Sequence, residues 1–174
     1  TGVVRDAVTL APVPGACVDV YHRDSVTGAF NPVAWDCADA SGSYAVEGLL
    51  SGSHYADVKN FSGYVTALYD GFTCVGYLCD LSAGTAIPVT FGQTTAGVDF
   101  GLEIGGVIRG VVRDESTSSG LAYTQVSVFR RVGGAGIERV STSTDTSGAY
   151  EVRLLPPGTY FAYTTSWRGY GNEI

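Results

Sequence analysis

The sequence predicts an all-β protein built from tandem antiparallel β-sandwiches, and three observations support this fold class. Valine, threonine, serine and tyrosine are abundant, glycine occurs 24 times in 174 residues, and only 16% of the residues are charged. This composition suits pleated strands that are separated by tight turns. Apolar and polar residues alternate with a period of two over short stretches, and no long stretch has a helical period. About seven short strands per unit, with turns every 8–12 residues, are typical of an antiparallel sandwich.

The strands and turns can be assigned along the chain from these patterns. Alternation is most regular at 16–21, 124–129 and 150–154, and each segment is expected to form a strand with one buried face. Turn-forming dipeptides separate the strands. They are Pro14-Gly15, Ser41-Gly42, Ser51-Gly52, Gly133-Gly134, Ser147-Gly148 and Pro157-Gly158.

The second half of the chain repeats the first. Gly2-Val-Val-Arg-Asp6 returns unchanged as Gly110-Val-Val-Arg-Asp114, 108 positions later. The segment 39–46, with Asp-x-Ser-Gly-x-Tyr, returns at 145–152 with a spacing of 106. Two residues were therefore gained or lost between these motifs, where a hairpin connection tolerates a change in length. The chain is a tandem array of a unit slightly over 100 residues long.

We expect a first sandwich at 1–104 and a second at 105–174 that lacks its last strands. The second unit has no counterpart of 67–104, which includes the strand-like segment 97–104. Two explanations stay open. Either the chain is part of a longer polypeptide, or a strand from a neighbouring molecule completes the second unit.

The order of the motifs resembles the carboxypeptidase regulatory-like repeats. It runs Gly-x-Val-x-Asp, an alternating strand, Asp-x-Ser-Gly-x-Tyr, Leu-x-x-Gly and Gly-Tyr. These repeats are grouped with the transthyretin-like and collagen-adhesin B-type (prealbumin-like) sandwiches, and the sequence looks like tandem repeats of large secreted bacterial proteins. The resemblance implies a seven-stranded Ig-like or prealbumin-like sandwich that serves as a spacer or adhesion module and is rarely an enzyme.

The four cysteines are expected to form two disulfides, Cys17–Cys37 and Cys74–Cys79. The second unit has glutamine and serine at the positions of Cys17 and Cys37, so both cysteines are absent together, as a bonded pair predicts. Cys74 and Cys79 are close enough in sequence to close a small loop. An even count in an acidic protein that resembles secreted repeats favours disulfides over zinc or free thiols. The cysteines form no Cys-x-x-Cys pair, and His22 and His54 stand alone.

Catalysis, metal binding and cofactor binding are not expected. His22 and His54 lack the His-x-x-Glu zinc motif of a metallopeptidase, and no Gly-x-Ser-x-Gly elbow is present. Asp39 and its repeat Asp145 raise the possibility of calcium, but one carboxylate in a tight turn favours hydrogen bonding to the turn itself. The single lysine, Lys59, lies on a later strand than the lysine of the internal cross-link that the collagen-adhesin resemblance implies.

Charge and hydropathy exclude two classes of partner. The formal net charge of −7 and a pI near 4.6 argue against nucleic acid. No apolar run approaches the ~18 residues of a membrane-spanning helix.

Two functions therefore stay open. The first is a non-catalytic structural repeat of a secreted or cell-surface protein, acting as a stalk, adhesin spacer or extracellular filament subunit, with neighbouring repeats or copies of itself as partners. The alternative is a carbohydrate-binding module that stacks exposed aromatic rings on polysaccharide. The aromatic candidates are Trp35, Tyr69, Phe72 and Tyr77.

Overall fold

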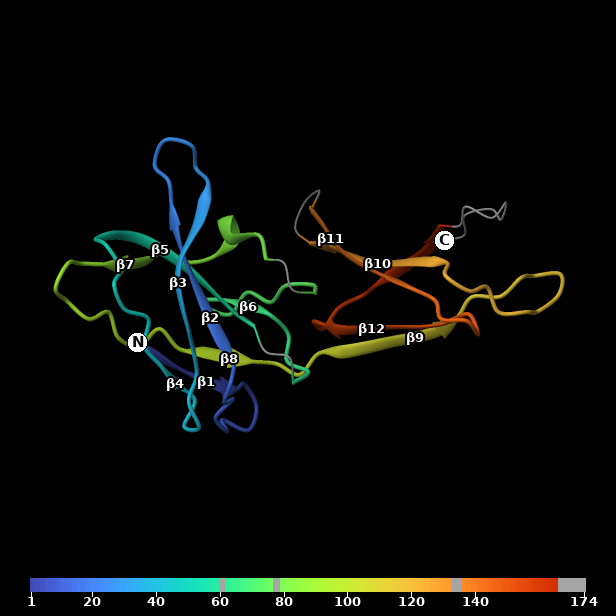
Figure 1. Ribbon diagram of the computed structural model, residues 1–174, viewed down its shortest axis with the longest axis horizontal. Helices are drawn as coiled ribbons and strands as arrows, with labels where there is room; N and C mark the ends of the chain where they lie inside the picture. The colour runs from blue at the N-terminus through green and yellow to red at the C-terminus, as the bar shows by residue number, and fades with distance from the viewer. Residues whose placement is uncertain (60–61, 77–78, 133–135, 166–174) are drawn as a thin grey trace. The chain divides into compact units, whose positions relative to one another are not determined.

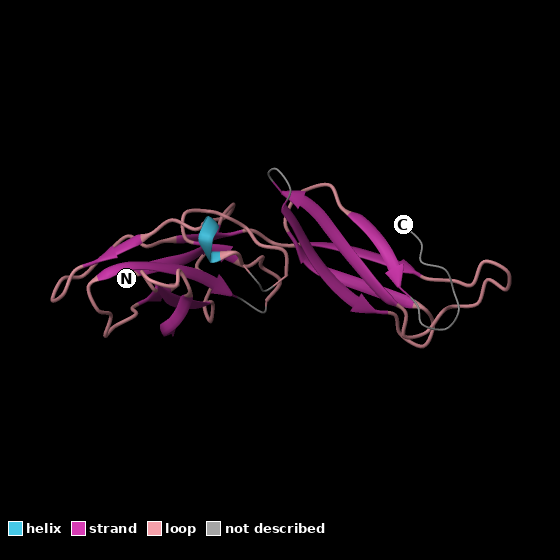
Figure 2. Ribbon diagram, turned by 90° about the horizontal axis from the view of Figure 1, so that it is seen from above, coloured by secondary structure: helices cyan, strands magenta, loops and turns pink. Residues whose placement is uncertain are grey.

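The computed structural model describes residues 1–59, 62–76, 79–132 and 136–165, and it divides the chain into two compact units, Thr1–Ile104 and Gly105–Ile174 (Figure 1). Both units are built from strands. In the described residues the one helix is the short 3₁₀ turn η1 (Leu81–Ala83), drawn in cyan in Figure 2. No helix among these residues has the length and hydropathy needed to cross a membrane.

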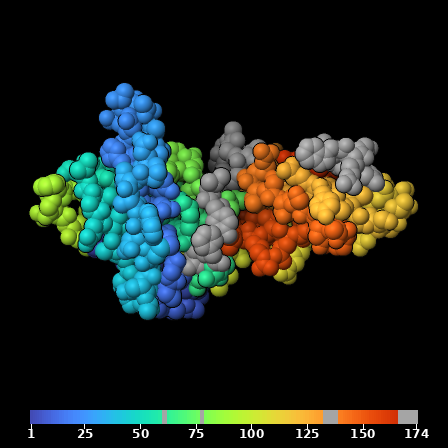
Figure 3. Space-filling model, in the orientation of Figure 1, coloured from blue at the N-terminus to red at the C-terminus, as the bar shows by residue number. Residues whose placement is uncertain are grey.

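The first unit is a sandwich of two sheets. One sheet has the strand order β4-β1-β8, and the other has the order β3-β2-β5-β6, with β7 also paired to β5. The strands are β1 (Gly2–Asp6), β2 (Cys17–Arg23), β3 (Phe30–Cys37), β4 (Ser43–Tyr44), β5 (Gly52–Lys59), β6 (Ala67–Leu68), β7 (Ile87–Val89) and β8 (Phe100–Leu102). The hairpin between β2 and β3 projects from the body of this unit (Figure 3).

The core of the first unit lies between the two sheets. It receives alternate side chains from each strand, because successive residues of a strand point to opposite faces. Val18 and Val20 of β2 are buried against Val4 of β1 and against Phe100 and Leu102 of β8. The alternation read from the sequence therefore identifies the buried face of β2.

One strand pair departs from a purely antiparallel sandwich. β1 and β8 run parallel, with Val4 opposite Phe100 and Asp6 opposite Leu102. A parallel pair requires a long crossover connection, and here the rest of the unit provides it. The last strand of the unit, β8, thus covers one edge of the first strand, β1. Local hairpin patterns in the sequence do not predict this long-range pairing.

The second unit repeats this architecture with fewer strands in its described residues. One sheet has the order β11-β10-β13 and the other pairs β12 with β9, all antiparallel. The strands are β9 (Gly106–Val111), β10 (Gln125–Val132), β11 (Gly136–Ser143), β12 (Ala149–Leu155) and β13 (Phe161–Thr165). Val126, Val128 and Val152 are buried in its core.

The two repeated motifs contact each other in both units. Gly42 and Gly148 have φ angles of +80° and +83°, and a Cβ at either position would lie 2.5 Å from the carbonyl oxygen of Val4 or Val112, respectively. Only glycine accommodates both the positive φ and this approach. The amide of Val4 donates to the carbonyl of Gly42, and that of Val112 to the carbonyl of Gly148. This contact explains why the two motifs return together in the second unit.

Candidate functional site

The four cysteines form two disulfides in the first unit. Cys17 and Cys37 are directly opposite each other on β2 and β3, and their bond joins these strands. Cys74 and Cys79 close a loop after β6. In the second unit Gln125 and Ser143 occupy the matching cross-strand position. The first unit therefore carries a covalent lock that the second lacks at the same place.

The repeated aspartates act as turn acceptors. Oδ1 of Asp39 accepts from the amide of Ser41 at 2.8 Å, its hydroxyl at 2.7 Å and the amide of Ser43 at 2.9 Å. Asp145 receives the same three contacts from Ser147 and Ala149. These hydrogen bonds, led by that of the serine hydroxyl, lower the pKa of both carboxyls.

The carboxylates of these turns are not gathered into a cation site. Among the described residues there is no group of three or more His, Cys, Asp or Glu side chains that could hold a metal ion. Calcium needs six to eight oxygen ligands, whereas the oxygen of each turn aspartate faces amide and hydroxyl donors.

Replacing Asp39 with alanine should destabilise the first unit at neutral pH. The folded-state pKa is depressed, so this stabilisation is present above the unfolded pKa near 3.8 and is lost as the pH falls through the depressed value. Thermal unfolding at pH 7 and pH 3 should show a large difference in Tm between Asp39→Ala and the unsubstituted chain at pH 7 and a smaller one at pH 3. Asp145→Ala should behave alike in the second unit, and Glu115→Ala, which alters an exposed acid, is the control. Equal losses at both pH values would contradict the role assigned to the ionised carboxylate.

The structure separates the four aromatic candidates. Trp35 on β3 is 68% exposed and Phe72 is 49% exposed. Tyr69 is half-buried against the core, with its ring centroid 6.0 Å from that of Phe100. Tyr77 lies outside the described residues. Tyr69 therefore packs inward and does not present its face as part of a stacking surface.

A charged cluster that the sequence analysis missed crosses β2 and β5. Asp19 and Asp57 are directly opposite each other, and Nζ of Lys59 lies 2.8 Å from Oδ2 of Asp19 and 3.4 Å from Oδ1 of Asp57. Burial raises the pKa of Asp57 to about 6, against the opposing effect of Lys59. Burial disfavours the ammonium of Lys59, but its hydrogen bond to Asp19 and the charge of Asp57 raise its pKa overall. One lysine thus compensates two facing carboxylates.

The second unit has neutral side chains where this cluster lies. Ser127 is opposite Tyr163, and Thr165 follows two residues later on the same strand. One signal in the sequence could have revealed the cluster. The single lysine of the chain lies two residues after Asp57, so both side chains are on the same face of the strand. Their partner Asp19 is identified only when β2 is paired with β5.

The edge of the first strand differs between the units. In the first unit β8 pairs with β1, and Phe100 and Leu102 are 4% and 1% exposed. In the second unit, the described residues provide no strand at the matching position. A groove with a cavity of about 240 Å³ lies there instead. It is lined by Val111, Val112, Arg113, Val126, Tyr150, Ala162, Tyr163 and Thr164.

These features define a tandem, disulfide-containing β-sandwich protein with an open groove beside the first strand of its second unit. Residues 107–171 match the family model of the carboxypeptidase regulatory-like domain. The resemblance predicted from the motif order is thereby confirmed for the second unit.

The solved structures that resemble this chain include bacterial pilins. A streptococcal ancillary pilin is 14% identical with a TM-score of 0.43, and the alignment covers 94% of this chain and 51% of the pilin. The shaft pilin SpaA from Lactobacillus rhamnosus GG is 13% identical with a TM-score of 0.38, covering 99% of this chain and 90% of SpaA. The chain thus spans about half the length of the streptococcal pilin. No curated protein matches the sequence.

Proposed function

We propose that this chain is a non-catalytic structural repeat module of a secreted or cell-surface protein, acting as a stalk, spacer or filament subunit. The observation that carries the proposal is the groove beside Val111–Arg113, at the position that β8 fills in the first unit. A further strand completes the second sandwich there, supplied either by the same polypeptide or by a neighbouring copy.

The burial of matched residues supports strand addition. Val4 lies in β1, which pairs with β8, and it is fully buried. Its repeat Val112 is only half-buried. Likewise Asp6 is buried, whereas its repeat Asp114 is only half-buried. An unpaired strand edge is a template for another strand, with backbone hydrogen bonds supplying affinity and side-chain pockets supplying selectivity.

The covalent and polar features support an extracellular structural role. Two disulfides are typical of proteins that work in an oxidising environment. The repeated aspartates are occupied as turn acceptors, and Lys59 is held by two carboxylates. The inward packing of Tyr69 gives no support to the carbohydrate-binding alternative.

A peptide with the sequence of 97–104 should bind the second unit of the full chain. Its Phe100 and Leu102 are the side chains that cover the matching groove in the first unit. We expect this peptide to slow hydrogen exchange of the amides of Val111 and Arg113, because the amide of Val112 already donates to Gly148 on the opposite edge. We expect a matched peptide with Phe100→Asp and Leu102→Asp to have no effect. Absence of protection with both peptides would contradict completion by strand addition.

Light scattering and negative-stain electron microscopy over a range of concentrations then identify the neighbour. Oligomers that grow with concentration, and that the 97–104 peptide suppresses, indicate a filament subunit completed by copies of itself. A monomer that binds the peptide indicates a module completed within its own polypeptide, as part of a longer stalk.

A further inference from the structure

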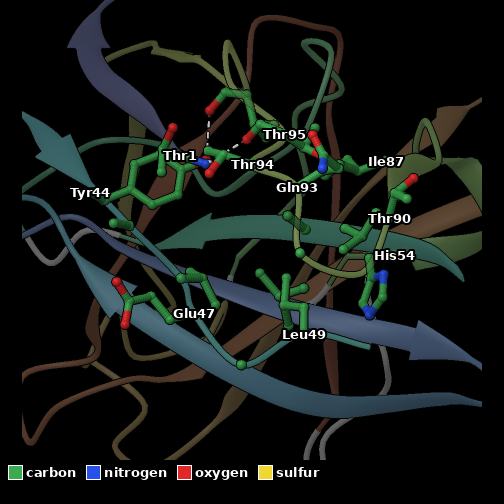
Figure 4. Close-up of a pocket in the computed structure, with 18 residues that line it drawn as sticks. Thr1, Tyr44, Glu47, Leu49, His54, Ile87, Thr90, Gln93, Thr94 and Thr95 are labelled. Carbon is green, nitrogen blue, oxygen red and sulfur yellow. Dashed lines mark hydrogen bonds between the residues drawn. The ribbon is translucent and has the colours of Figure 1, made fainter. Parts of the chain in front are cut away.

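A second groove lies in the first unit, where β1 begins. Its cavity has a volume of about 310 Å³. It is lined by 45–49 and by Thr90 and 92–95, and the buried Val20, Ala56 and Ile87 also line it. Thr1 lies at one end, beside Tyr44, and His54 lies at the other (Figure 4). The amino group of Thr1 donates to the carbonyl of Thr95 at 2.8 Å, so the start of the chain is held against another lining residue of the groove.

The second unit shows what occupies the matching position. There β9 extends upstream of the repeated Gly110, and Arg109, Ile108 and Gly106 pair with Glu151, Val152 and Leu155. In the first unit the ladder ends at Gly2 opposite Tyr44. The next residues, 45–49, are not in a strand. They therefore present an edge whose repeat is paired in the second unit.

The apolar side chains of this edge are more exposed than their repeats in the second unit, as expected where a covering strand is absent. Val152 and Leu155 are each 3% exposed beside β9. Their repeats Val46 and Leu49 pack against the core of the first unit but are only half-buried. Valine and leucine at the same repeat positions are therefore buried where a strand covers them and half-exposed where no strand does.

We propose that this groove binds an extended segment with the chemistry of 105–108, Gly-Gly-Val-Ile, supplied by the connecting segment of another repeat. The segment runs antiparallel to 45–49 and places its isoleucine opposite Val46, as Ile108 lies opposite Val152. Its glycines matter because a Cβ at Gly105 would lie 2.5 Å from Cα of Leu154 in the second unit. This inference rests on the proposed role as a repeat module, and it specifies how each repeat is joined to the one before it.

The register defines the experiment. Thr1 occupies the position of Arg109, so the residues Ile-Gly-Gly-Val-Ile, copied from 104–108, are added directly before Thr1 of the full chain. We expect hydrogen exchange within 45–49 to slow by about tenfold or more at the amide of Val46, since a paired amide exchanges only after local opening. The amide of Ala45 already donates to Asp36 and faces the other way. We also expect the Tm of the first unit to rise. The matched control adds Ile-Gly-Gly-Pro-Asp, which removes one backbone donor and the apolar side chain, and should change neither quantity.

Each outcome decides the proposal. Protection of 45–49 by the first extension alone supports it. Protection by both extensions or by neither overturns it, and so does concentration-dependent protection in the unextended chain, because the occupant would then be a second copy. The proposed function is tested separately at 111–113 with the 97–104 peptide, so a failure at 45–49 leaves that result intact.

Discussion

Replacing Lys59 with methionine should destabilise the first unit by about 2–3 kcal/mol. Lys59 lies between Asp19 and Asp57, which face each other across β2 and β5. Without the ammonium two carboxylates oppose each other, and the side chain of Asp57 is only 5% exposed. This loss is smaller than the roughly 3–5 kcal/mol of a fully buried broken pair, because the side chains of Lys59 and Asp19 are 26% and 32% exposed.

The pH dependence of this loss separates charge from packing. The folded-state pKa of Asp57 is raised to about 6, so the stability gained by protonating it is present at low pH and is lost as the pH rises through about 6. The cost of Lys59→Met should therefore be larger at pH 8 than at pH 5. Denaturant unfolding, followed by hydrogen exchange of peptides from β2 and β5, measures it.

Two variants control this experiment. Adding Asp57→Asn to Lys59→Met should restore most of the stability, because it removes one of the facing charges. Thr165→Met alters the matching position of the second unit, where Ser127 and Tyr163 are neutral, and should have little effect. An equal loss at pH 5 and pH 8 would show that Lys59 acts through its aliphatic stem rather than its charge.

Removing the Cys17–Cys37 disulfide with the double change to alanine should cost the first unit about 3 kcal/mol, by the loop-entropy relation. The bond spans 20 residues, whereas Cys74–Cys79 spans five. Since the entropy removed from the unfolded chain grows with loop length, the corresponding change at Cys74 and Cys79 should cost less, about 2 kcal/mol. Denaturant unfolding of the two double variants and of the unsubstituted chain, under oxidising conditions, gives both values.

The second unit supplies the reciprocal experiment. Gln125 and Ser143 are opposite each other on β10 and β11, as Cys17 and Cys37 are on β2 and β3. Changing both to cysteine should form a new bond and stabilise the second unit. If the Cys17 and Cys37 double variant unfolded at the same denaturant concentration as the unsubstituted chain, the cross-strand bond would have no part in stabilising the first unit.

Local patterns in the sequence were sufficient for the fold class, for the strands around 16–21, 124–129 and 150–154, and for the turns at Ser41-Gly42 and Ser147-Gly148. The expected turn at Gly133-Gly134 lies outside the described residues. Alternation marked the buried face of β2 because neighbouring side chains of a strand point to opposite faces. The Asp-x-Ser-Gly turns could be read directly, since Asp39 and Gly42 satisfy needs of the backbone within a few residues. Comparison of the two repeats added the pairing of Cys17 with Cys37, because both are replaced together.

Features that depend on strands distant in sequence could not be read in this way. The parallel pairing of β1 with β8, the position of Lys59 between two aspartates, the inward packing of Tyr69 and the groove of the first unit arise only when the sheets are assembled. Each is set by contacts between segments dozens of residues apart. Alternation shows which side of a strand is apolar, but it carries no information about which strand lies beside it or whether that edge is covered.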